Sequence, residues 1–242
     1  DVTALGDVLA ARIATIAFFL LGCFAVWYTT YLLGRRSEAQ PLKLAFGGQP
    51  EPHDYGRMLA DGALLIYLGC LGLLLPSHST SAEALQVSLM ACCMYAAVRL
   101  FESHSLRAGA MLGVALGLLT LTHGWIVPLM SWLGLLTLAS RRERVLMARL
   151  LMATLPVAIC IASIWLITSH YVRPFNSSPY NAWMLWNYRQ LDLPSWDALK
   201  YLLKNGIWFA WPAWPFAGWA LYAWRRQRQA PHIALPLTFL LV

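Results

Sequence analysis

The side chains of this chain that are suited to chemistry are few, and they stand apart from its arginine clusters. Glu83 and His123 are the candidate catalytic residues, because a carboxyl group and an imidazole both exchange protons with a bound molecule. His78, Arg173 and Arg189 are the candidate substrate-binding residues. A guanidinium donates two parallel hydrogen bonds to a phosphate or a carboxylate. These side chains are therefore the candidates for a polar site.

The composition predicts that these residues are held by a membrane protein. Of 242 residues, 59% are hydrophobic and 12% are charged. So few charges cannot cover such a core in water, whereas a bilayer accepts apolar surface on every side. We therefore expect an all-α fold, a polytopic transmembrane helical bundle in contact with membrane lipids. The net charge of +7 resides in short clusters between apolar runs, so nucleic acid is not an expected partner.

The apolar runs divide the chain into expected spans. We place spans at residues 9–33, 59–76, 84–100, 108–122, 124–140, 150–170 and 205–224, with a truncated one at 232–242. Their basic flanks and the polar loop 34–58 are expected in the cytoplasm by the positive-inside rule. The outer segment 171–204 is rich in Trp and Tyr, and "SWDALKYLL" predicts a short amphipathic helix capped by Ser195. Residues 1–242 are expected to be one transmembrane domain, a fragment of a longer protein.

The run from Ala108 to Ser140 predicts a hairpin. It contains no Asp, Glu, Lys or Arg, and as one helix it would measure about 50 Å, well beyond the roughly 30 Å hydrocarbon core. Basic residues stand on both sides of it, which requires an even number of passes. The break is expected in "THGWIVP", with His123 at the tip of two short arms, below the outer surface in a hollow.

This topology gathers the candidate residues at the outer leaflet. Ionisable groups at membrane depth are energetically costly and face a cavity or a partner, so we expect a polar site there. Simpler interpretations stay open for three of them. Glu83 also fits the first turn of a helix capped by Ser81, His123 fits a structural bond to a backbone carbonyl, and Arg189 fits a solvated charge.

No nucleotide-binding or hydrolase motif occurs in the sequence, and the five cysteines lie in apolar runs without metal-type spacing, so no metal ligands are assigned.

Four segments in order carry a resemblance: "VLAARIATIAFFLLGCFAVWYTTYLLGRR", "SHSTSAEAL", "GVALGLLTLTHGWIVPLM" and "WFAWPAWPFAGWALYAWRR". Their succession resembles the bacterial polyprenyl-phosphate-dependent glycosyltransferases of the GT-C superfamily. That group contains the lipid A aminoarabinose transferases and is related to the protein O-mannosyltransferases. The resemblance covers about residues 5 to 228.

The resemblance implies an enzyme that moves a sugar from a polyprenyl-phosphate donor to a lipid or protein acceptor at the outer face of the bacterial inner membrane. Its active site would face the periplasm or the cell exterior. Glu83 stands where the family has Asp, and His123 stands where it has Lys. The family's acidic catalytic loop is expected before Asp1, with Glu83 in support. In this reading His123 donates to the donor phosphate, and Arg173 and Arg189 bind it. The cofactor stays unassigned, with a divalent metal ion open.

Two other functional classes stay open. A membrane transporter or flippase would use the same outer cavity, although it should show related halves and charges near mid-depth. The other class is a noncatalytic membrane subunit, which would not require a complete set of catalytic residues. The position of the polar residues at one leaflet favours the glycosyltransferase.

Overall fold

The computed structural model describes residues 2–41, 47–70, 72, 82–122, 124–172, 179–189, 191, 195–227 and 230–242. Within these ranges the chain is all-helical, without a β-strand, as the sequence predicts. Its elements are α1 (Val2–Gly34), the 3₁₀ turn η1 (Ser37–Ala39), α2 (Pro52–Gly69), α4 (Ala82–Ser103), α5 (Leu106–Thr122), α6 (Ile126–Ser140), α7 (Arg144–Arg149), the π-helical turn η2 (Leu150–Thr154), α8 (Leu155–Val172), α9 (Pro179–Arg189), α10 (Trp196–Phe209), α11 (Ala213–Ala223) and α12 (Pro231–Leu240).

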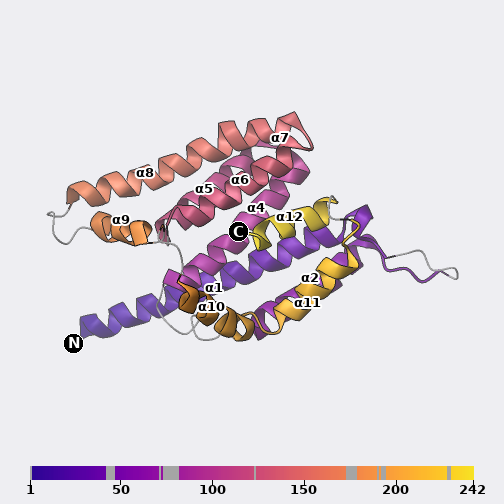
Figure 1. Ribbon diagram of the computed structural model, residues 1–242, viewed down its shortest axis with the longest axis horizontal. Helices are drawn as coiled ribbons and strands as arrows, with labels where there is room; N and C mark the ends of the chain where they lie inside the picture. The colour runs from indigo at the N-terminus through magenta and orange to yellow at the C-terminus, as the bar shows by residue number, and fades with distance from the viewer. Residues whose placement is uncertain are drawn as a thin grey trace.

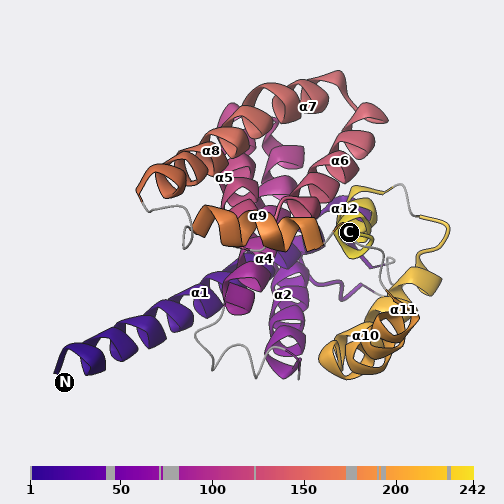
Figure 2. The same cartoon turned by 60° about the vertical axis from the view of Figure 1, so that its left-hand side comes forward.

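The helices form a layered assembly with α4 at its centre. Helix α4 packs against α1 on one side and α5 on the other, α2 lies along α1, and α8 lies along α5 (Figure 1). Helix α12 fills the space beside α4 and α6. Figure 2 shows that the first part of α1 projects away from the other helices. The helices that carry the hairpin and α9 are thus held on one side of α4.

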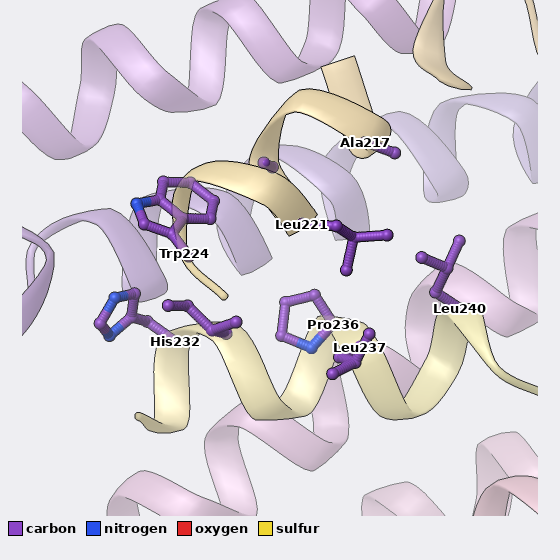
Figure 3. A pocket seen from close by; sticks show the side chains of 9 residues that line it. Ala217, Leu221, Trp224, His232, Pro236, Leu237 and Leu240 are labelled. Atoms are coloured by element: carbon purple, nitrogen blue, oxygen red, sulfur yellow. The ribbon is translucent and has the colours of Figure 1, made fainter. Parts of the chain in front are cut away.

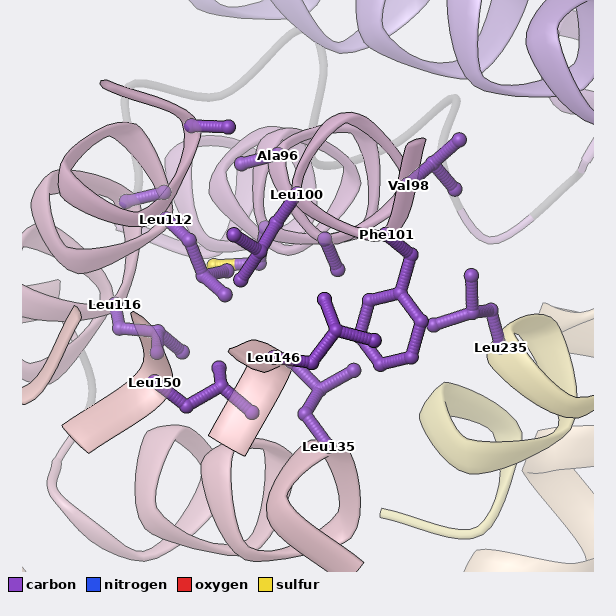
Figure 4. Close-up of a cluster of buried hydrophobic side chains, with 14 of the residues drawn as sticks. Ala96, Val98, Leu100, Phe101, Leu112, Leu116, Leu135, Leu146, Leu150 and Leu235 are labelled. Atoms are coloured by element: carbon purple, nitrogen blue, oxygen red, sulfur yellow. The ribbon is translucent and has the colours of Figure 1, made fainter. Parts of the chain in front are cut away.

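Apolar side chains from α1, α4, α5, α6, α7, η2 and α12 make the core. Leu100 of α4, Leu112 of α5, Leu135 of α6 and Leu235 of α12 are fully buried and belong to one cluster (Figure 4). Leu150, at the start of η2, joins them. Burying a leucine side chain contributes about 1.5 to 3 kcal/mol in water, so this cluster fixes the relative positions of the central helices.

Glycines allow α5 and α8 to approach closely. Gly109, Gly113 and Gly117 recur every four residues and therefore lie on one face of α5. A Cβ atom added to Gly113 would stand 2.6 Å from the carbonyl oxygen of Thr154, which leaves no room for a larger residue. The Thr154 hydroxyl donates to the Gly109 carbonyl oxygen at 3.0 Å. Small residues at such spacing are a common basis of helix contact in membranes.

Three helical segments are long and apolar enough to cross a membrane: Leu9–Gly34, Leu85–Ser103 and Arg144–Tyr171. Helices α5 and α6 are apolar but shorter, as expected for the two arms of a hairpin. Large apolar side chains are exposed on the long helices, among them Ile13 at 58% and Ile164 at 67%. Exposed apolar surface of this extent is typical of lipid contact.

Some element boundaries differ from the predicted ones. The predicted span 205–224 is instead two helices, because α10 continues to Phe209 and the chain turns at 210–212 before α11. Pro212 has no backbone N–H to continue the helix. Helix α2 begins at Pro52, inside the loop predicted over 34–58, because proline is favoured in the first helical turn.

Candidate functional site at the hairpin tip

Helix α9 lies across the end of the α5–α6 hairpin and is attached to it by side-chain hydrogen bonds (Figure 2). Asn187 is 4% exposed. Its Oδ1 accepts a hydrogen bond from the backbone N–H of Trp125 at 3.1 Å, and its Nδ2 donates to the Trp183 carbonyl oxygen at 2.7 Å. The indole N–H of Trp183 donates to the carbonyl oxygen of Thr120 at 3.0 Å. One helix therefore holds both arms of the hairpin at their tip.

The bond from Trp125 has a local cause. The first N–H groups of a helix have no partner within the helix, and Trp125 directly precedes α6. Asn187 supplies the missing acceptor from a distant part of the chain. Gly124 has φ +141°, in the region that favours glycine, so it allows the sharp change of direction between α5 and α6. Gly124 thus provides the backbone conformation of the tip, and Asn187 accepts the hydrogen bond from the start of α6.

The end of α8 completes the contact. His170 lies edge-on to Tyr180 of α9, with 5.1 Å between the ring centroids. It also lies edge-on to its neighbour Tyr171 at 5.4 Å. Because α8 and α9 meet through aromatic rings, α9 is fixed over the space between the hairpin and α8.

An apolar groove lies below α9, between α5, α6 and α8. It has a volume of about 200 Å³. Its walls include Thr120 and Trp125, whose backbone groups bind α9, together with Leu116, Pro128 and Ile159. The floor is closed by Trp132, whose indole N–H donates to the carbonyl oxygen of Leu150 in η2 at 3.2 Å. This arrangement can hold a hydrocarbon chain beneath a more polar rim.

Only part of the predicted site falls within the residues that the structure describes. Arg189 is the last residue of α9, two positions after Asn187, and its side chain is exposed. The backbone of Glu83 lies in the first turn of α4, but its side chain is outside the described part. His78, His123 and Arg173 also lie outside it. The structure thus brings the segment of Arg189 to the hairpin tip, while the roles assigned to the other four residues stay predictions.

Sequence reasoning missed the residues that join α9 to the hairpin. Asn187 and Trp125 are 62 positions apart, and Trp183 and Thr120 are 63 apart. No helical period connects residues at such separations. The one local signal was an asparagine in the aromatic stretch "NAWMLWNYR", which a purely interfacial helix does not need to bury.

A second apolar groove, of about 230 Å³, lies between α11 and α12 (Figure 3). It is lined by Leu221, Trp224, Pro236 and Leu240, with His232 at one end. Across the described part of the chain, no group of three or more His, Cys, Asp or Glu side chains is suited to holding a metal ion. The groove therefore offers apolar contact without a charged cluster.

The arginine-rich segments meet at the end of the molecule opposite the hairpin tip. Arg35 and Arg36 approach Glu102 in the last turn of α4, and His104 contacts Glu143 with 3.0 Å between Nε2 and Oε2. The side chain of Arg149 donates to the carbonyl oxygen of His104 at 3.1 Å. The chain thus has one end rich in arginine and another where α9 lies on the hairpin tip beside the apolar groove.

Comparisons of this chain with protein-family models, with curated proteins and with solved structures found no match.

Proposed function

We propose that this chain forms the membrane domain of a glycosyltransferase that moves a sugar from a polyprenyl-phosphate donor to a lipid or protein acceptor. In this proposal the helices form a polytopic bundle in the bacterial inner membrane, with the arginine-rich end in the cytoplasm. The hairpin tip then faces the periplasm or the cell exterior. The order of the four sequence segments that resemble the GT-C family supports this assignment.

The observation that carries the proposal is the apolar groove beneath α9. A polyprenyl-phosphate donor has a hydrocarbon tail and an anionic head, and it needs a site that joins an apolar channel to a cation. The groove supplies the apolar part, and Thr120 and Trp125 belong to both its wall and the α9 contact. Arg189, at the end of α9, supplies an exposed guanidinium for the phosphate.

The reaction follows from this placement of the donor. The acceptor oxygen bonds to the anomeric carbon, the bond from that carbon to the phosphate oxygen breaks, and the polyprenyl phosphate leaves with the electron pair. The acceptor proton passes to a carboxylate, a role that Glu83 supports. His123, when protonated, and Arg173 stabilise the phosphate, and His78 contributes to substrate binding.

A photocrosslinking and transfer experiment tests the proposal. The full-length protein is reconstituted in bilayers with a polyprenyl phosphate that carries a benzophenone in its tail, and with the same lipid bearing a labelled sugar. We expect crosslinks in the groove and transfer of the label to an acceptor. Ala162→Trp fills the groove and should reduce both signals about tenfold, since the tail loses its apolar contacts.

Ala17→Trp is the matched control, because Ala17 is exposed on α1 and does not line the groove. It should leave crosslinking and transfer unchanged. Equal crosslinking in the Ala162→Trp protein would contradict the groove as the tail site. Crosslinking without any labelled product, over a panel of sugar donors and acceptors, would contradict the transferase activity while retaining the lipid site.

A further inference from the structure

A polar hollow lies where α1 and α4 end, away from the groove. It has a volume of about 590 Å³ and is open to solvent. Three arginines line it, Arg35 and Arg36 directly after α1 and Arg99 in the last turns of α4, together with Glu38 and Glu102. The hollow thus presents more cationic than anionic side chains.

The cations of this hollow are incompletely paired within the protein. Arg35 and Arg36 both approach the same oxygen of Glu102, at 4.0 and 3.9 Å, which is beyond hydrogen-bond distance. The Nε of Arg36 is buried and has no hydrogen-bond partner in the described part of the chain. Arg99 is exposed and has no ion-pair partner among the described residues. A buried N–H without an acceptor is costly, so an external anion would relieve this site.

The turn between α6 and α7 adds to the positive potential. Burial lowers the pKa of the Arg142 guanidinium, and the neighbouring charge of Arg36 lowers it further, against the opposing effects of Glu38 and Glu143. Arg142 therefore contributes to the positive potential around Arg36. An anion placed near Arg36 would be attracted by both.

The location of the hollow indicates the source of the anion. Helices α1 and α4 contain two of the three segments that are long and apolar enough to cross a membrane, and both segments end at the hollow, at Gly34 and Ser103. In a bilayer the hollow is then level with the lipid headgroups. Basic pockets between helices at this level bind anionic phospholipids, and arginine matches the geometry of a phosphate.

We propose that the hollow formed by Arg35, Arg36 and Arg99 binds the phosphate headgroup of an anionic phospholipid. The bound lipid holds the ends of α1 and α4 together by bridging arginines that Glu102 alone pairs incompletely. This site is separate from the groove beneath α9, and it does not depend on the proposed sugar transfer.

Lipid binding to the full-length protein in nonionic detergent tests this inference. Phosphatidylglycerol, phosphatidylcholine and inorganic phosphate are titrated separately, and bound lipid is counted by native mass spectrometry. We expect phosphatidylglycerol to bind at least tenfold more tightly than phosphatidylcholine. In Arg36→Gln/Arg99→Gln, phosphatidylglycerol affinity should fall about tenfold or more, because each cation near a headgroup contributes about a further fivefold.

Arg141→Gln/Arg144→Gln is the matched control. It removes the same number of charges from exposed positions at the same end of the molecule, outside the hollow. An equal loss of affinity in this control would overturn the site, as would equal binding of the two lipids by the unmodified protein. Saturation of the hollow by inorganic phosphate, with displacement of phosphatidylglycerol, would assign it to a soluble anion instead.

A conservative variant covers the case in which the double substitution does not fold. Arg36→Lys keeps the charge but loses the planar guanidinium, so phosphatidylglycerol affinity should fall severalfold while the protein stays folded. An unchanged affinity in this variant would overturn the assignment of Arg36 to the phosphate.

Discussion

The substitution Asn187→Ala tests whether α9 is held on the hairpin as the structure indicates. It removes the acceptor of the Trp125 N–H and the local bond to the Trp183 carbonyl oxygen. Loss of the acceptor leaves the Trp125 N–H unpaired next to buried Gly124, which costs about 1 to 3 kcal/mol of stability. Loss of the bond to the Trp183 carbonyl oxygen, which lies within α9, costs about 0.5 to 1.5 kcal/mol. Most of the effect should therefore come from the contact between the two elements.

Asn205→Ala provides the matched control for this prediction. Asn205 in α10 also donates to the carbonyl oxygen four residues before it, Tyr201, at 2.9 Å, but it is exposed and does not cap another helix. Both substitutions lose an amide and a local bond, and only Asn187→Ala loses the bond from Trp125. The difference between the two variants isolates that bond.

Hydrogen exchange measured by mass spectrometry on the reconstituted protein gives the readout. In Asn187→Ala the amide of Trp125 should exchange about 5 to 150 times faster than in the unmodified protein, the factor that corresponds to about 1 to 3 kcal/mol. Peptides from α9 should also exchange faster, since the helix loses a bond to the tip. Protection of Trp125 equal to that in Asn205→Ala would refute the capping role of Asn187.

Other perturbations test the α5–α8 contact, the charge at the end of α9 and the orientation of the hairpin. Gly113→Ala should lower the free energy of unfolding by about 1 to 3 kcal/mol, because its Cβ would meet the backbone of Thr154. Gly62→Ala is the control and should be neutral or stabilising, because the space around Gly62 is open. Equal unfolding midpoints of the two variants would contradict the close contact at Gly113. Arg189→Ala should weaken the apparent affinity for a polyprenyl-phosphate donor about tenfold, and unchanged donor saturation would argue against the contact. His123→Cys, in a protein without its native cysteines, should react with an impermeant thiol reagent added outside intact cells, and reaction only from the cytoplasm would reverse the orientation.

The hairpin was predictable because its signal is a length mismatch. An uncharged run that exceeds the bilayer thickness must fold back, and Gly124 marks the place. The observed arms, α5 and α6, end and begin within a few residues of that glycine. The cap of α10 was equally local: Ser195 Oγ accepts a hydrogen bond from the Ala198 N–H at 3.2 Å, as predicted.

The division of 196–223 into α10 and α11 was not predicted correctly, because apolar windows do not locate helix ends. Residues 206–224 contain only apolar and aromatic residues, but the amphipathic helix that starts at Trp196 continues to Phe209, shortly before Pro212 interrupts the pattern of backbone bonds. The close approach of α5 and α8, by contrast, was available in the sequence. The four-residue repeat of Gly109, Gly113 and Gly117 is a known pattern of helix contact.

The candidate site was only partly predictable for a different reason. Arg189 was selected because it is an arginine in the segment expected at the outer leaflet. The bonds that place its helix depend on Asn187 meeting Trp125, and that contact exists only after the hairpin has folded. Residue spacing predicts helix caps and helical periods, but it does not predict a contact between residues 62 positions apart.

The π-helical turn η2 accommodates one extra residue between α7 and α8. A π turn holds one residue more than an α-helical turn, and each residue advances an α-helix by about 100°. Deleting one residue within Leu150–Thr154 would therefore restore an α-helical turn and leave α8 in nearly its present rotation, with Ala158 and Ile159 still on the groove wall. The same deletion in the regular helix between η2 and Ala158 would instead turn both residues by about 100°, away from the groove, so η2 is the place where this part of the chain tolerates a change of length.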